Sequence, residues 1–318
     1  MMKILCCPHA GGEPKNPAYV PDNQYLRCLD LAVKMKCEWV SFPWAFDYIW
    51  ADPEKPRHER LLWVVSECVE RGLAPIMINQ ASVYPNQPKW VNLAGQTTWY
   101  PTCPPVKLWD PIAHRCSETL NVVWNAMIDL GVDPTGCGVW QPHREPGVGG
   151  VGQSETKNMK EGTWSTAVKN YIQYLTYNVN TLGFLMASPS LECQLASFDK
   201  ELETAFDKSW ARYDLIFAHL YEWKDSPTTR AIYQSMLIRD RLLLNGIQDR
   251  DIVWAEMGHK DTHDVDFVRA KMVESQVNNC GGAAWYCALG ETKWSFLPYD
   301  SNPSVKEIRR PEGKPTQE

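Results

Sequence analysis

Eight short apolar runs, each followed by a stretch with helical character, constrain the fold of this 318-residue chain more than any other feature. The runs are apolar nearly throughout instead of alternating between apolar and polar residues, which is typical of parallel strands covered on both faces. They cover residues 3–10, 37–46, 73–80, 137–145, 182–192, 213–223, 251–258 and 282–290. Eight strand–helix units in one chain predict an α/β fold, the (β/α)8 TIM barrel.

The segments between the runs have the spacing of amphipathic helices. Residues 24–36 and 59–72 repeat apolar residues with a period near 3.6, and Gly72 ends the second segment as a helix C-cap does. A doubly wound open sheet is the alternative. Such a sheet usually carries a glycine-rich phosphate-binding turn after a strand, and neither G-x-G-x-x-G nor a Walker sequence stands at these positions.

The spacing of the runs predicts one domain with a long insertion. We expect a catalytic barrel over residues 1–298 and a polar C-terminal tail over residues 299–318. The third and fourth runs are separated by the longest gap, which contains the Pro-rich and Trp-rich residues 81–111. Long insertions in compact domains are usually functional, so we predict that this one contributes to a binding site.

Charge and hydropathy exclude several classes of partner. The net charge is −6, and Lys and Arg are scattered along the chain, so we predict no nucleic-acid binding. No apolar run approaches the roughly 20 residues that span a bilayer. The apolar run at the start is shorter than that of a secretory signal, so we expect a cytoplasmic protein. Oligomeric state has no signature in the sequence.

The cysteines and histidines predict neither disulfides nor a metal enzyme. Eleven cysteines are an odd number, no C-x-x-C pair occurs, and several lie inside apolar runs, as expected of reduced core thiols. Residues 258–264 contain two His and two Asp, but their spacing is not that of H-E-x-x-H. We therefore expect no catalytic metal and no organic cofactor.

The ends of the runs carry side chains that are able to take part in catalysis or binding. In a barrel of this kind the chemistry lies at the carboxyl ends of the strands and on the loops that follow. The candidates are three acids, two histidines, an arginine and two aromatic residues: Glu145, Glu192, Glu256, His143, His219, Arg144, Tyr221 and Trp285. We predict that they converge on one rim. A barrel built for stability alone would not require this set.

Two carboxylic acids at one barrel mouth indicate cleavage of a glycosidic bond. One acid protonates the leaving oxygen, and the other attacks the anomeric carbon or activates water. The ends of the fourth and seventh strands lie across the barrel, so Glu145 and Glu256 are the natural pair. A separation of roughly 5–5.5 Å between them would give retention of configuration.

Three short motifs at these ends carry a family resemblance. They are REP at 144–146, HLY at 219–221 and EMG at 256–258. With them, the chain resembles clan A of the glycoside hydrolases over essentially the whole barrel. These are retaining (β/α)8 enzymes that include cellulases, mannanases and β-glycosidases. The resemblance implies a carbohydrate substrate.

The resemblance also implies roles for individual residues. Glu145 corresponds to the acid/base, and Glu256 corresponds to the nucleophile. Tyr221 or His219 would orient the nucleophile or its neighbour. Trp285 matches the tryptophan that forms the floor of the sugar subsite in many members.

Two departures from the family pattern concern the charge around the site. Arg144 stands where members carry an Asn that contacts the sugar 2-hydroxyl, and residues 40–46 lack the arginine of many members. A positive charge beside Glu145 favours its ionised form and lowers its pKa, which is the wrong direction for a general acid. Arg144 is a candidate to supply the missing positive charge.

Further residues are expected to bind substrate. His143, Arg144 and Glu192 are placed to contact it, with Glu192 an alternative acid. Tryptophan rings stack on the apolar face of a sugar, so the three tryptophans of the insertion are candidate platforms: Trp90, Trp99 and Trp109.

Each candidate also has a purely structural interpretation. Glu145 is able to cap a helix or pair with Arg144, His219 and Tyr221 are compatible with ordinary core positions, and loop tryptophans often pack locally. We predict a glycoside hydrolase acting on a β-linked glycan or glycoside. The alternatives are a carbohydrate-binding barrel without turnover, with a structural or adhesive role, and a lyase or metal-dependent hydrolase that uses the histidines.

Overall fold

The structure is a computed structural model, and it describes a large part of the chain. The described residues are 2–8, 10, 20–44, 46–79, 104–143, 146, 164, 166–192, 198–221, 227–247, 250–258, 282–285, 289–290 and 297–298. They include part of each predicted run, and they leave out the last residues of the third, fourth and sixth runs.

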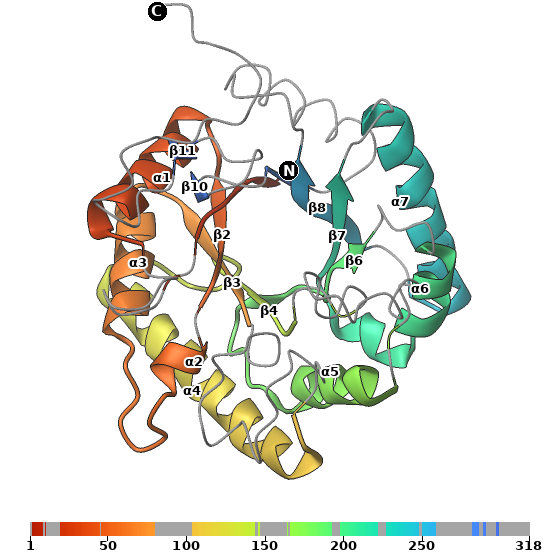
Figure 1. The fold of residues 1–318 in the computed structure, drawn as a ribbon, viewed down its shortest axis with the longest axis horizontal. Helices are drawn as coiled ribbons and strands as arrows, with labels where there is room; N and C mark the ends of the chain where they lie inside the picture. The colour runs from red at the N-terminus through yellow and green to blue at the C-terminus, as the bar shows by residue number, and fades with distance from the viewer. Residues whose placement is uncertain are drawn as a thin grey trace, which may run out of the picture.

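The described strands form one large parallel sheet (Figure 1). Its order is β5-β4-β3-β2-β1-β9-β8-β7-β6, and every pair of neighbours is parallel. The strands are β1 Met2–Cys6, β2 Trp39–Pro43, β3 Ala74–Ile78, β4 Val139–Gln141, β5 Leu185–Met186, β6 Leu191–Glu192, β7 Leu215–Tyr221, β8 Asp251–Gly258 and β9 Gly282–Trp285. A separate parallel pair consists of β10 Leu289–Gly290 and β11 Leu297–Pro298.

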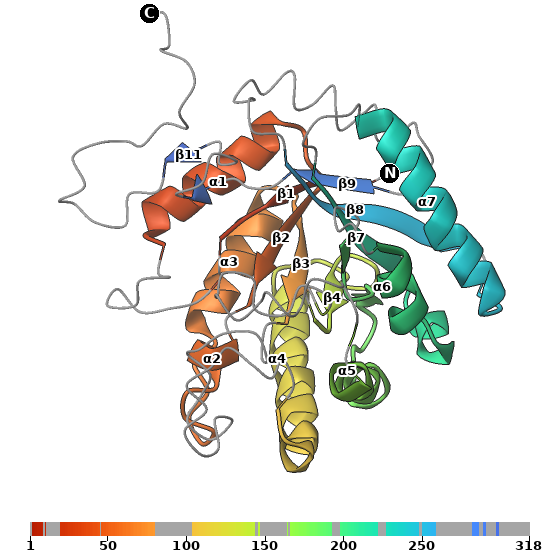
Figure 2. The same ribbon diagram turned by 45° about the vertical axis from the view of Figure 1, so that its right-hand side comes forward.

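Helices lie outside this sheet and alternate with its strands (Figures 1 and 2). They are α1 Asp22–Lys34, α2 Phe46–Ile49, α3 Glu59–Glu70, α4 Trp109–Asp129, α5 Thr166–Asn178, α6 Phe198–Ala205 and α7 Pro227–Leu244, with the 3-10 turns η1 Val106–Leu108 and η3 Lys208–Arg212. The predicted α/β class with parallel strands is therefore confirmed. The predicted insertion over residues 81–111 stays a prediction, since residues 81–103 lie outside the described part of the structure and the chain is helical from Val106 onwards.

Helix α3 shows how the sequence pattern produces a local element. Its buried residues Leu61, Val64, Val65 and Cys68 are three or four positions apart and therefore share one face. Gly72 follows with φ of +68°, a conformation that glycine adopts without steric cost. The C-cap position itself belongs to Arg71, and Gly72 ends the helix as the residue directly after it.

Both faces of the sheet are buried, as the continuous apolar runs predict. One set of strand residues packs with the surrounding helices: Leu5, Val40, Met77, Trp140, Ile216, Ile252 and Trp254. The alternate residues form a second cluster: Ile4, Cys6, Ile76, Val139, Ala187, Leu215, Phe217, Val253 and Ala255. Since successive strand residues point to opposite faces, the first set defines the helix-facing side and the second the inner side.

The predicted fifth strand is interrupted. Residues 182–192 form β5, which pairs with β4, and β6, which pairs with β7. Pro189 lies between them, and proline cannot donate a backbone hydrogen bond to a sheet. Ala187 still forms a parallel bridge with Leu215 at the start of β7. One continuous segment therefore contacts β4 at one end and β7 at the other.

Buried polar side chains support this interrupted segment. Gln141 of β4 donates from Nε2 to the Ser188 carbonyl at 3.0 Å and to Ser190 Oγ at 2.9 Å. The Ser188 hydroxyl accepts the backbone N–H of Phe217 in β7 at 2.9 Å. Side chains thus provide hydrogen bonds where the regular strand pairing stops.

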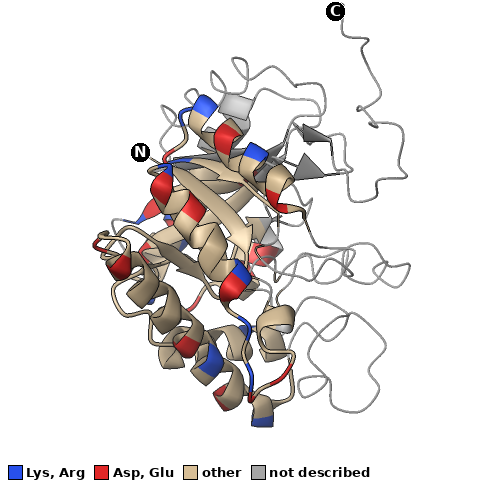
Figure 3. Ribbon diagram, turned by 90° about the vertical axis from the view of Figure 1, so that its left-hand side faces the viewer, with Lys and Arg blue, Asp and Glu red and all other residues tan. Residues whose placement is uncertain are grey.

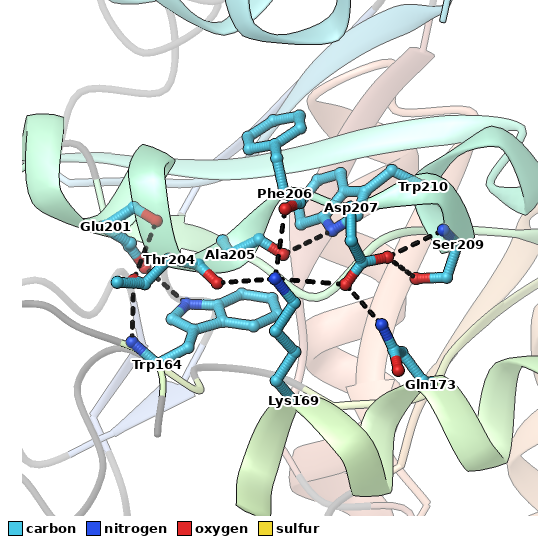
Figure 4. A network of polar contacts seen from close by, with 10 residues as sticks. All are labelled: Trp164, Lys169, Gln173, Glu201, Thr204, Ala205, Phe206, Asp207, Ser209 and Trp210. Carbon is cyan, nitrogen blue, oxygen red and sulfur yellow. Dashed lines mark hydrogen bonds and ion pairs between the residues drawn. The ribbon is translucent and has the colours of Figure 1, made fainter. Parts of the chain in front are cut away.

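A second polar network ties the helices α5 and α6 together (Figure 4). Lys169 of α5 donates to two carbonyls at the end of α6 and lies 3.3 Å from Asp207 Oδ2, which also accepts from Gln173 at 2.6 Å. The Trp164 indole donates to the fully buried Glu201 carboxylate at 3.1 Å. These contacts anchor the chain where it enters α5 after the β4 loop.

The outer helices carry charges of both signs. Figure 3 shows Lys and Arg interspersed with Asp and Glu along the helices that face the viewer. Among the helices in the described part of the chain, none is long and apolar enough to cross a membrane.

Several described cysteines are deeply buried thiols, as the sequence predicts. Cys7, Cys68 and Cys116 have no disulfide partner and are almost fully shielded from solvent. Burial raises the pKa of each of these thiols, because the thiolate would lose its hydration. Cys137 is only partly buried.

The thiol environments predict an order of alkylation. Under native conditions, iodoacetamide should modify Cys137 before Cys7, Cys68 or Cys116, because the thiolate is the reactive form and burial disfavours it. Peptide mapping by mass spectrometry gives the order, and a denatured sample should lose it. Equal alkylation rates at Cys7 and Cys137 in the native protein would contradict the difference in burial between these thiols.

The side chains around Pro189 predict a stability effect. Ser188→Ala should lower the free energy of unfolding by about 1–3 kcal/mol, because the buried Phe217 N–H loses its acceptor. Ser66→Ala is the matched control, since its exposed hydroxyl makes one long contact of 3.4 Å with Glu70. Its effect should stay within about 0.5 kcal/mol. Urea unfolding measures both variants, and equal effects would argue against the proposed support.

Candidate functional site

The ends of β7 and β8 bring two predicted site residues together. His219 Nε2 lies 3.7 Å from Glu256 Oε1. Both residues are buried, with exposed fractions of 1% for His219 and 3% for Glu256. Burying an ionised carboxylate is costly unless a polar partner compensates it. The position of His219 supplies such a partner, and a positive charge when the imidazole is protonated.

A β-bulge in β8 produces this pairing. Along β7, Ala218 pairs with Trp254 and the next residue, His219, pairs with Glu256, so Ala255 is an additional residue in β8. The pairing with β9 shows the same shift, since Trp254 pairs with Ala283 and Met257 pairs with Trp285. Bulges of this kind redirect side chains and are frequent beside active sites.

The bulge decides which face of the sheet Glu256 occupies. Ile252 and Trp254 belong to the helix-facing cluster, so regular alternation would direct Glu256 to that side as well. One additional residue reverses the alternation. Glu256 therefore shares the face of its register partner His219, two residues after Phe217 of the inner cluster.

The backbone register adds a third predicted residue to this row. Glu192 of β6 pairs with His219, which pairs with Glu256. Three acid or histidine positions thus stand side by side on neighbouring strands. Tyr221 pairs with Gly258, two residues beyond this row, and Trp285 ends β9. The side chains of Glu192, Tyr221 and Trp285 lie outside the described part of the structure.

The end of β4 is described as far as His143. This side chain is fully buried, at the end of the strand and directly after Pro142. Arg144 and Glu145 lie outside the described residues. Their predicted roles, and the predicted separation of the two carboxyl groups, therefore stay predictions.

Asn79 fixes the end of β4 and was missed by the reasoning from sequence. Its backbone N–H donates to the Gln141 carbonyl at 2.9 Å, and its side-chain Nδ2 donates to the Pro142 carbonyl at 3.2 Å. Its Oδ1 accepts the Trp44 indole N–H at 3.2 Å. The one available signal was a polar residue at the end of a strongly apolar run, because a buried amide needs partners of this kind.

The tryptophans of the insertion are only partly described. Trp109 begins α4 and packs on α5, with ring centroids 5.7 Å from Tyr171 and 5.5 Å from Tyr174. Its indole N–H donates to the Pro104 carbonyl at 2.8 Å. These are packing contacts between helices, and sugar stacking by Trp109 stays a prediction. Trp90 and Trp99 lie outside the described residues.

The described residues contain no candidate metal site. Within the described ranges, no group of three or more His, Cys, Asp or Glu residues is arranged to hold a metal ion. The His- and Asp-containing residues 259–264 lie outside those ranges.

Comparisons with known proteins identify the fold. Neither protein-family models nor curated proteins match the sequence. Among solved structures, a GH5_18 protein from Streptomyces cattleya in complex with GlcNAc has a TM-score of 0.59 at 15% identity, over 94% of this chain and 76% of that one. A GH5-4 broad specificity endoglucanase from Clostridium acetobutylicum has a TM-score of 0.57 at 12% identity, over 93% and 92%.

A third similar structure is much longer than this chain. It is an exo-β-1,4-mannosidase from Opitutaceae bacterium strain TAV5, with a TM-score of 0.56 at 14% identity over 91% of this chain. This chain spans about half of its length, 52%. The chain therefore shares its fold with glycoside hydrolases of family GH5, and the resemblance to clan A is confirmed at the level of the fold.

The contact between His219 and Glu256 predicts energetic coupling. A double-mutant cycle with His219→Leu and Glu256→Gln should give a coupling energy of about 0.5–3 kcal/mol in urea unfolding, as for buried residues in contact. The exposed pair Arg241–Glu203, at 3.5 Å, is the matched control and should give less than about 1 kcal/mol. Strictly additive effects at His219 and Glu256 would show that the two side chains act independently.

Proposed function

We propose that this chain is a glycoside hydrolase that cleaves a β-linked glycan or glycoside with retention of configuration. The observation that carries the proposal is the buried Glu256 carboxylate, which a bulge turns towards His219 at the carboxyl end of a parallel strand. The carboxyl ends of such strands carry the chemistry in barrel enzymes. The shared fold with an endoglucanase and an exo-β-1,4-mannosidase supports a carbohydrate substrate.

The proposal includes closure of the sheet into an eight-stranded barrel. In this interpretation β5 and β6 are two parts of one strand that joins β4 to β7. The Ala187–Leu215 bridge and the hydrogen bonds of Gln141 and Ser188 support it. Closure would bring the end of β4 and the end of β8 to the same rim, as a two-carboxylate mechanism needs.

The proposed mechanism has two displacement steps. Glu256 attacks the anomeric carbon while Glu145 donates a proton to the leaving oxygen, which gives a glycosyl-enzyme. Glu145 then removes a proton from a water molecule that attacks the same carbon and releases Glu256. The two carboxyl groups would be roughly 5–5.5 Å apart. Neither a metal nor an organic cofactor takes part.

The remaining candidates have supporting roles in this mechanism. His219 and Tyr221 orient the Glu256 carboxylate, and burial of His219 beside it supports that role. His143, Arg144 and Glu192 bind the sugar hydroxyls around the cleaved bond. The aromatic residues stack on sugar rings: Trp285, Trp90, Trp99 and Trp109.

Covalent trapping tests the proposal. A panel of 2-deoxy-2-fluoro glycosides with activated leaving groups should add one glycosyl mass to the peptide that contains Glu256, because fluorine slows hydrolysis of the intermediate. Glu256→Gln should abolish labelling. Glu201→Gln is the matched control, since Glu201 is another buried carboxylate but contacts Trp164 on the helical layer. That variant should keep the label.

The alternatives give different results in the same experiment. Sugar binding without labelling or turnover would favour a carbohydrate-binding barrel, in which Arg144 has replaced the usual contact beside the acid. Turnover that a chelator abolishes would favour a metal-dependent enzyme. Labelling of a residue other than Glu256 would overturn the assignment of the nucleophile.

A further inference from the structure

The bulge that aims Glu256 is held by a thiol from another strand. Cys6, the last residue of β1, donates from Sγ to the carbonyl of Ala255 at 3.3 Å. The Ser41 hydroxyl of β2 donates in turn to Cys6 Sγ at 3.2 Å. All three residues are buried, with exposed fractions of 5% for Cys6, 8% for Ala255 and 4% for Ser41. They form a hydrogen-bonded row from β2 through β1 to the bulge.

The geometry explains why such a contact has an effect at Glu256. Ala255 is the additional residue against β7, and the pairing with β9 is shifted between Trp254 and Met257, so the regular pairing of β8 is disturbed on both sides at this point. A buried carbonyl that loses its hydrogen bond costs about 1–3 kcal/mol. The thiol therefore stabilises the bulged backbone relative to a regular one.

The competing backbone arrangement would remove Glu256 from the site. Without the additional residue, Glu256 would follow Trp254 to the helix-facing side. Cys6 and Ala255 both belong to the inner cluster, and β9 lies between β1 and β8 in the sheet. The Cys6 thiol therefore contacts the Ala255 carbonyl across the inner side of the sheet. This contact is separate from the backbone pairing of β8 with β7 and β9.

We propose that Cys6, supported by Ser41, is a positioning residue that fixes the β8 bulge and so directs the Glu256 carboxylate towards the reacting carbon. The inference rests on the proposed function, because Glu256 is taken as the nucleophile. Cys6 itself touches no substrate in this proposal. Its contribution is made through the carbonyl of the residue before Glu256.

The test compares the chemical step with binding. The rate constant for covalent trapping of Glu256 and the dissociation constant of the same 2-deoxy-2-fluoro glycoside are measured for wild type and variants. Cys6→Ala should lower the trapping rate constant about 3- to 10-fold, because the lost contact is a hydrogen bond from a weak donor, of at most ordinary strength. The dissociation constant should change less than about 2-fold, because ground-state binding does not need the attacking orientation.

A conservative variant separates the hydrogen bond from packing. Cys6→Ser keeps a donor at the same position and should regain most of the wild-type trapping rate. Ser41→Ala removes the donor behind the thiol, leaves Cys6 in place and should lower the rate less than Cys6→Ala does. If Cys6→Ala does not fold, these two variants still test whether the hydrogen bond of Cys6 affects the trapping rate.

A second thiol of the chain provides a matched control. Cys28 of α1 is also buried and also donates to a carbonyl at 3.3 Å, that of Gln24. Cys28→Ala removes the same group at the same hydrogen-bond length, away from the bulge. Its thermal unfolding should shift about as much as that of Cys6→Ala, whereas its trapping rate should equal that of wild type.

The outcomes distinguish failure of this inference from failure of the proposed function. Wild-type protein that no glycoside of the panel labels would overturn both. Labelling of wild type together with an unchanged rate in Cys6→Ala would overturn only the role of Cys6. The role of Cys6 would also be overturned if Cys6→Ser lowered the trapping rate constant as much as Cys6→Ala does. The same holds if Cys28→Ala lowered it equally, because general loss of stability would then explain the effect.

Discussion

The buried contact between Glu256 and His219 is the interaction around which the candidate site is organised. An ionised carboxylate in an apolar sheet is costly, and the described structure lowers that cost by placing a histidine 3.7 Å away. The arrangement depends on one additional residue in β8, because regular alternation would direct Glu256 to the helices. Its position at the carboxyl end of a parallel strand, where barrel enzymes carry their chemistry, makes this carboxylate the leading candidate.

Polar side chains complete the backbone where prolines prevent regular pairing. Pro189 interrupts the segment between β4 and β7, and Gln141 and Ser188 supply hydrogen bonds there. Pro142 follows β4, and the amide of Asn79 holds its carbonyl. In both places a buried amide or hydroxyl replaces a missing strand contact. The buried polar side chains of Gln141, Ser188 and Asn79 therefore hold the backbone near the strand ends.

The similarity to GH5 glycoside hydrolases at 12–15% identity has a physical basis. A fold of parallel strands covered by helices needs apolar runs at the right intervals, and many residue choices satisfy that requirement. The chemistry depends on a few side chains at the strand ends. In the sequence, Arg144 stands where the resembled family carries an Asn, directly before the proposed acid Glu145, and both residues lie outside the described part of the structure.

Reasoning from the residues alone predicts the apolar runs, the alternation of strands and helices, the end of a helix at Gly72 and the acids and histidines at strand ends. These features depend on local periodicity and composition, which a single chain displays directly. The three-dimensional arrangement adds the break at Pro189, the hydrogen bond from Asn79 to the Pro142 carbonyl and the face that Glu256 occupies. Each of these depends on the register between strands far apart in the chain, and an additional residue in one strand is visible only against its neighbours.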